Sequence, residues 1–204
     1  MVKIMKPRVG MIFMPESEIS RRYRSIVTPS WNNAGYEIES HTAITPQNYE
    51  LFKEKLPVKL NFGTKKGGRN KGKPLTDTEK AIWYSHIQMW SIAARKTNPF
   101  IVIEHDVLLL KHIDHAIIDK YPIVGLSHCG LLSKFPEKGY RISAGGAYLL
   151  KNDIAKKMIK ELPKEININS DGYIHSYITK YGAFRHEHTT QIYIPEFGST
   201  INHD

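Results

Sequence analysis

The sequence predicts a single α/β domain, built on a mixed, mostly parallel sheet with helices on its faces. Strand-like and helix-like segments alternate along the 204 residues, and several of the strand-like segments are apolar throughout. Such strands are typical of parallel sheets, because helices cover both of their faces. No internal repeat or change of composition divides the chain, so we expect one domain over residues 1–204.

The first three elements predict a strand–helix–strand unit. Residues 9–14 are apolar, residues 16–33 resemble a helix, and residues 36–41 alternate between polar and apolar side chains. Because proline lacks the amide proton that a helix interior uses, we expect Pro29 to end this helix early. A unit of this kind begins many α/β sheets.

The helix expected over residues 76–96 has the clearest signals in the chain. Thr76 and Glu79 form a capping box, which satisfies two backbone amides at the start of a helix. Apolar residues then recur at helical spacing, which predicts one buried face. This face comprises Ile82, Trp83, Ile87, Trp90 and Ala94.

The remaining elements follow from shorter patterns of the same kind. We expect further strands over residues 100–110, 122–127, 143–150 and 191–194. Helices are expected over residues 47–56, 153–162 and 171–181, with Asn152 as the cap of the second, and a short helix or loop over 111–121. Residues 166–170 form a short extended piece.

An acidic segment interrupts the most apolar strand. Glu104 and Asp106 lie two residues apart, so in a strand their side chains share one face while His105 points away. Two buried carboxylates need a compensating cation, and the carboxyl edge of an α/β sheet is where ligands bind. The alternative is a structural acidic pair neutralised by a nearby Lys or Arg.

Residues 63–74 are rich in glycine and cations and contain no acid, so we expect a mobile surface loop. Its cations are Lys65, Lys66, Arg69, Lys71 and Lys73. Such a loop binds phosphates through its charge and its backbone amides, or it is simply solvated. It is not a Walker loop, because no Gly-Lys-Ser or Gly-Lys-Thr element follows.

Several further residues have both a structural and a functional interpretation. A single histidine on a packed helix, such as His86, is more often a hydrogen-bonded core residue than a catalytic one. Gly145 and Gly146 indicate either a close backbone approach to a ligand or a turn. Asp171 begins a helix, where an acid also interacts favourably with the helix dipole.

Composition narrows the class of protein. The chain is 41% hydrophobic and 24% charged, its formal net charge is +9, and no apolar run approaches the ~20 residues of a membrane span. The charge favours polyanionic partners. The N-terminus lacks the apolar core of a signal peptide, and the single cysteine, Cys129, excludes an intrachain disulfide framework. We therefore expect a cytoplasmic, reducing location.

Taken in order, these motifs resemble glycosyltransferase family 25, the lipopolysaccharide-type sugar transferases with a GT-A fold. The resemblance spans nearly the whole chain, and its most specific part is the Ser-His helix followed by the acidic strand. The matching pieces are Leu75-Thr76 with Glu79, Ser85-His86 with Trp90, Val102–Val107, Gly146–Leu149 with Ala155–Lys157, Asp171, and Phe197–Ile201. His105 departs from the family, which usually has Glu-Asp-Asp at this segment, and the chain is short for the family.

The resemblance implies inverting transfer of a sugar from a nucleotide donor, with a UDP-sugar favoured, onto a hydroxyl group. It implies that Asp171 is the catalytic base and that Glu104 and Asp106 hold a divalent metal, Mn or Mg. The donor would contact Ser85, His86, Gly145, Gly146, Arg21 and Arg22. The cations of residues 65–73 would bind the phosphates of the acceptor.

The acceptor is less clear from the sequence. Family analogy favours a glycan such as a lipopolysaccharide core. The net charge and the basic loop favour a hydroxymethylated base in phage-type DNA, which is the acceptor we expect from the sequence. A non-catalytic nucleic-acid-binding module, with a purely structural acidic strand, is a second alternative.

Overall fold

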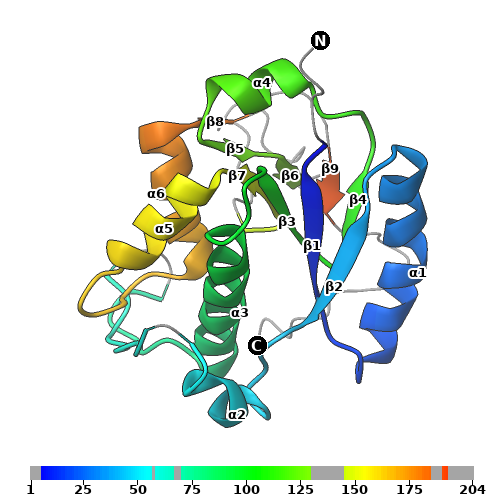
Figure 1. Ribbon diagram of the computed structural model, residues 1–204. Helices are drawn as coiled ribbons and strands as arrows, with labels where there is room; N and C mark the ends of the chain where they lie inside the picture. Colours follow the sequence, from blue (N-terminus) through cyan, green and yellow to red (C-terminus); the bar gives the residue numbers. More distant parts are fainter. Residues whose placement is uncertain (1–5, 57, 67–69, 130–144, 185–189, 193–204) are drawn as a thin grey trace.

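The computed structural model describes residues 6–56, 58–66, 70–129, 145–184 and 190–192 (Figure 1). Its strands are β1 (Arg8–Phe13), β2 (Ile38–Thr42), β3 (Phe100–Glu104), β4 (Val107–Leu109), β5 (Ile123–Gly125), β6 (Ser127–Cys129), β7 (Ala147–Leu150), β8 (Ala183–Phe184) and β9 (Thr190–Ile192). Its helices are α1 (Glu18–Asn33), α2 (Tyr49–Lys53), α3 (Asp77–Ala93), α4 (His115–Lys120), α5 (Asn152–Lys160) and α6 (Ser170–Tyr181).

A six-stranded sheet in the order β2-β1-β3-β7-β5-β8 forms the centre of the molecule. β1 pairs in parallel with β2 and β3, and β5 pairs in parallel with β8. β7 runs antiparallel to both of its neighbours, β3 and β5. The predicted α/β class with a mostly parallel sheet is therefore confirmed. The amino end of β7 consequently meets the carboxyl ends of β1 and β3 at one edge.

Two hydrophobic cores cover the two faces of this sheet. α3, α5 and α6 lie on one side, and α1 lies on the other beside β4 (Figure 1). The first core contains the buried side chains of Trp83, Trp90 and Tyr148. The second contains Trp31 and Ile101. Adjacent residues of β3 alternate between the two cores, which explains why this strand is apolar throughout.

Helix α1 continues through Pro29, so the prediction that this proline ends the helix early is wrong. Val27 and Trp31, on either side of it, are fully buried. The indole Nε1 of Trp31 also donates to the carbonyl oxygen of Val107 at 3.0 Å. This packing compensates for the backbone hydrogen bond that proline cannot make.

The strand expected over residues 100–110 is two strands. β3 ends at Glu104, a turn follows, and β4 belongs to a second sheet of order β4-β9-β6. The amide of Leu109 donates to Oγ of Ser30 at 3.1 Å, so α1 draws β4 away from the central sheet. The strand expected over 122–127 divides in the same way into β5 and β6.

One smaller expectation also needs correction. Lys151, rather than Asn152, occupies the cap position of α5, and it makes no side-chain capping bond. The glycine-rich segment is anchored where it is described, because the amide of Lys65 donates to the carbonyl of Lys73 and that of Lys66 to Asn167. The capping box of Thr76 and Glu79 is formed as predicted.

Candidate active site at the carboxyl edge of the sheet

The acidic segment lies where β3 ends. Glu104 is the last residue of β3 and pairs in register with Ile12 of β1. His105 and Asp106 form the turn that follows, and all three residues line a cavity of about 140 Å³. The ring of His105 contacts that of Tyr23 in α1, with ring centroids 5.7 Å apart, whereas Glu104 faces α3. The structure thus places both carboxylates at the sheet edge, with Asp106 just beyond the strand.

The two carboxylates have different electrostatic environments. Burial, together with the negative charge of Glu104, raises the pKa of Asp106 to about 7. Burial also acts to raise the pKa of Glu104, but His86 and His105 lower it below its ordinary value. Oδ1 of Asp106 is buried and has no hydrogen-bond partner among the described residues. An ionised carboxylate therefore lies beside one that a nearby cation would ionise.

A buried chain of hydrogen bonds joins α3 to β7 and holds His86. Nε1 of Trp90 donates to the hydroxyl of Tyr148 at 2.8 Å, and this hydroxyl lies 3.0 Å from Nδ1 of His86. Since the hydroxyl accepts from the indole, its own proton is available to Nδ1, and we assign a ring proton of His86 to Nε2. Nε2 lies 3.7 Å from Oε1 of Glu104, which is an electrostatic contact rather than a hydrogen bond.

Asp171 joins this cluster from the first turn of α6. A Cβ atom on Gly145 would overlap Oδ1 of Asp171 and lie 3.6 Å from Nε2 of His86, so these three residues adjoin one another. Burial and the charge of Glu104 raise the pKa of Asp171, His86 acts in the opposite direction, and the net pKa is about 6. A carboxylate with such a pKa is suited to accept a proton near neutral pH.

Two of the predicted donor-binding residues have structural contacts at this edge. Oγ of Ser85 accepts from the amide of Ile44 at 2.8 Å and donates to the carbonyl of Ala81 at 3.1 Å. Ser85 therefore fixes the segment after β2 against α3, and it lines the same cavity as His86. The carbonyl of Gly146 accepts from the amide of Glu104 at 2.9 Å.

The structure does not bring Arg21 and Arg22 into this cavity. Arg21 donates to the carbonyl of Pro15 at 2.7 Å and lines a separate hollow beside α1. Arg22 forms an exposed ion pair with Glu18 in the same helix, with 2.7 Å between the charged atoms. Sequence spacing alone indicates a cationic helix but not which way each guanidinium points.

The cations of residues 63–74 are only partly available to a ligand. Nζ of Lys65 lies 2.7 Å from Oε1 of Glu79, and only 12% of this lysine side chain is exposed. Lys66, Lys71 and Lys73 are exposed. Arg69 lies outside the described residues.

Tyr148 is the site residue that the sequence did not identify as functional. It lies 62 positions from His86, so no local pattern connects the two. The spacing of His86 and Trp90 could have predicted part of this cluster, because residues four apart on a helix share a face. A tyrosine within an apolar strand also indicates a buried hydroxyl that needs a partner.

The fold and the acidic cluster together are typical of α/β enzymes that bind a ligand at the carboxyl edge of the sheet. The model of glycosyltransferase family 25 (LPS biosynthesis protein) matches residues 16–123, more than half of the chain. The chain therefore belongs to glycosyltransferase family 25 and is a glycosyltransferase. Membership in this family implies a nucleotide-sugar donor. It also means that the alternative of a non-catalytic nucleic-acid-binding module is wrong.

Other comparisons are more distant. No curated protein matches the sequence significantly. The crystal structure of mouse xyloside xylosyltransferase 1, apo form, is similar at 10% identity and a TM-score of 0.41, over 86% of this chain and 76% of that chain. Within the described part of this chain, no helix is long and apolar enough to span a membrane.

Proposed function

We propose that this enzyme transfers a sugar from a UDP-sugar to a hydroxyl group of a glycan, with inversion at the anomeric carbon. The observation that carries this proposal is the position of Asp171, whose carboxylate lies against Gly145 and beside His86. Its raised pKa fits a general base. The family description supports a glycan of the lipopolysaccharide type as the acceptor.

In the proposed reaction, the acceptor hydroxyl oxygen attacks the anomeric carbon from the face opposite the diphosphate. Asp171 takes the hydroxyl proton as the new carbon–oxygen bond forms. The bond to the diphosphate breaks at the same time, and its electron pair leaves with the diphosphate. One displacement of this kind inverts the configuration at the anomeric carbon. His86, beside Glu104, keeps the carboxylate of Glu104 ionised.

The acidic pair fits a divalent cation held jointly with the donor. Among the described residues, no three His, Cys, Asp or Glu side chains form a group that would hold a metal by themselves. Glu104 and Asp106 still offer two carboxylates, one with a buried oxygen that has no hydrogen-bond partner in the part of the chain that the structure describes. Mg²⁺ and Mn²⁺ are commonly bound by one or two carboxylates plus the phosphates of a substrate. When bound, the cation would neutralise negative charge on the leaving diphosphate.

A hydroxymethylated base in DNA remains a second candidate acceptor, and the charge of the protein favours it. The formal net charge is +9, and Lys66, Lys71 and Lys73 are exposed. Binding to DNA would weaken steeply with salt. Release of nucleoside diphosphate with hydroxymethylated DNA, but not with unmodified DNA or with glycans, would establish this acceptor instead.

The role of Asp171 can be tested by replacing it with asparagine. Asp171→Asn should lower turnover by about 10²–10⁴-fold, because the amide cannot accept the proton. Donor binding, followed by thermal shift with UDP-sugar and Mn²⁺, should persist. Asp153→Asn is the matched control, since Asp153 lies in the first turn of α5 and is exposed. Normal turnover of Asp171→Asn would reject the assignment.

A further inference from the structure

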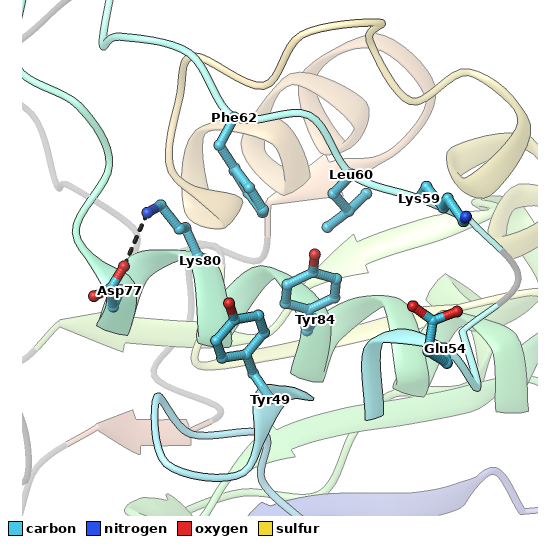
Figure 2. Close-up of a pocket in the computed structure, with 8 residues that line it drawn as sticks. All are labelled: Tyr49, Glu54, Lys59, Leu60, Phe62, Asp77, Lys80 and Tyr84. Atoms are coloured by element: carbon cyan, nitrogen blue, oxygen red, sulfur yellow. Dashed lines mark hydrogen bonds and ion pairs between the residues drawn. The ribbon is translucent and has the colours of Figure 1, made fainter. Parts of the chain in front are cut away.

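Another hollow, of about 490 Å³, lies on a neighbouring face of α3 (Figure 2). We call it the tyrosine pocket, and its lining residues are Tyr49, Glu54, Lys59, Leu60, Phe62, Asp77, Lys80 and Tyr84. They come from three segments that are separate in sequence: α2 with the residue after it, residues 59–62, and the first half of α3. A pocket of this size is typical of small-molecule sites.

Three aromatic rings line this pocket and contact one another. The rings of Tyr49 and Tyr84 lie nearly parallel, at 18° with centroids 6.1 Å apart, and Phe62 meets Tyr84 edge-on at 5.8 Å. Tyr84 is only 7% exposed, whereas Tyr49 and Phe62 are partly exposed, so a guest would contact chiefly the rings of Tyr49 and Phe62. The apolar C–H face of a pyranose packs against such a surface.

The charges around the rings balance. Lys59 and Lys80 contribute two positive charges, and Glu54 and Asp77 contribute two negative charges. Nζ of Lys80 lies 2.8 Å from Oδ1 of Asp77. A balanced rim does not select a polyanion, but it offers donors and acceptors that suit the hydroxyl groups of a neutral sugar.

The tyrosine pocket adjoins the active-site cavity. Thr45, Pro46 and Ala81 line the active-site cavity, whereas Tyr49 and Lys80, which follow or precede them in the same segments, line the tyrosine pocket. We propose that the tyrosine pocket binds a neutral sugar ring of the acceptor glycan, next to the ring that receives the transferred sugar. This inference rests on the proposed function and makes its acceptor a saccharide with an uncharged residue.

The test is an NMR titration of the full chain with lactose, maltose and methyl hexosides as probes. Tyr49→Ala should weaken binding by about tenfold, and Tyr49→Phe should retain it, because the ring is the contact. Tyr181→Ala is the matched control, since Tyr181 is also partly exposed but lies at the end of α6. Circular dichroism and titration with UDP and Mn²⁺ should show that Tyr49→Ala keeps its fold and its donor site.

Three results would overturn the inference: no sugar binding by the parent chain, equal losses in Tyr49→Ala and Tyr181→Ala, or a loss in Tyr49→Ala of affinity for an oligodeoxynucleotide but not for sugars. Sugar binding that depends on Tyr49, without any donor binding, would support the tyrosine pocket and reject the proposed transferase reaction. The two failures are therefore distinguishable.

Discussion

At the scale of single residues, the buried carboxylate of Asp106 lowers the stability of the folded protein when it is ionised. Its pKa is about 7 in the folded protein against 3.8 ordinarily, so the folded state binds more protons between these values. Stability then falls as the pH rises from about 4 to about 7. This penalty is the expected mark of a ligand site rather than of a structural ion pair.

Replacing Asp106 with asparagine should therefore stabilise the protein without added metal. We expect Asp106→Asn to raise the free energy of unfolding by about 2 kcal/mol at pH 8 and to have little effect near pH 4. Urea denaturation at both pH values in the presence of EDTA measures this. Asp119→Asn, at an exposed position of α4, is the control. An equal gain at both pH values would contradict the explanation.

Gly145 acts through the space that it leaves for Asp171. Gly145→Ala should displace the Asp171 carboxylate and lower turnover by about 100-fold, because misplacement by about 1 Å has effects of this size. In the Asp171→Asn background, the same substitution should cost nothing further, since both changes act on one group. Steady-state rates of the single and double variants measure this. Additive losses would show that Gly145 has another role.

At the scale of elements, the contact between α3 and β7 sets the orientation of His86. Tyr148→Phe should leave Trp90 Nε1 and His86 Nδ1 without their shared partner and lower stability by about 1–3 kcal/mol. It should also change the tautomer of His86, visible in its imidazole ¹⁵N shifts, and lower turnover.

Tyr173→Phe separates the loss of a buried hydrogen bond from the effect on the tautomer of His86. The hydroxyl of Tyr173 donates to the carbonyl of Met158 at 2.7 Å, so this variant also loses a buried hydrogen bond. It should lose stability but leave the ¹⁵N shifts of His86 and the turnover unchanged. If both variants behave alike, the chain through Tyr148 is structural only.

Some of these elements were predictable because their signals are local. The capping box of Thr76 and Glu79 fixes the start of α3, and the acidic residues Glu104 and Asp106 line a cavity at the end of β3. The continuation of α1 past Pro29 was not predictable, since it depends on the burial of Trp31 against a strand far along the chain. The pairing of His86 with Tyr148 likewise depends on tertiary packing.

At the scale of the whole molecule, a basic protein encloses an acidic cavity. The chain has a formal net charge of +9, yet Glu104 and Asp106 line the cavity and Asp171 lies beside it. Surface charge would attract anionic ligands from a distance, whereas the cavity itself would repel a bare diphosphate.

We therefore expect donor binding to depend on a divalent cation. UDP-sugar with Mn²⁺ should raise the melting temperature by a few degrees, and UDP-sugar with EDTA should raise it much less. KCl at matched ionic strength is the control, and Asp106→Asn should reduce the Mn²⁺-dependent part. An equal shift with and without Mn²⁺ would show that this enzyme binds its donor without a metal.

The antiparallel direction of β7 determines where insertions could change the acceptor preference of the candidate site. Because this strand runs antiparallel to β3 and β5, Gly145 and Gly146 lie at the edge that holds the candidate site, and the chain leaves that edge along β7. Extra residues inserted at Gly145 would lie beside Asp171 and His86, whereas the same insertion after Leu150 would lie at the opposite end of β7. New acceptor preferences are thus most accessible to evolution, and to protein engineers, upstream of this strand.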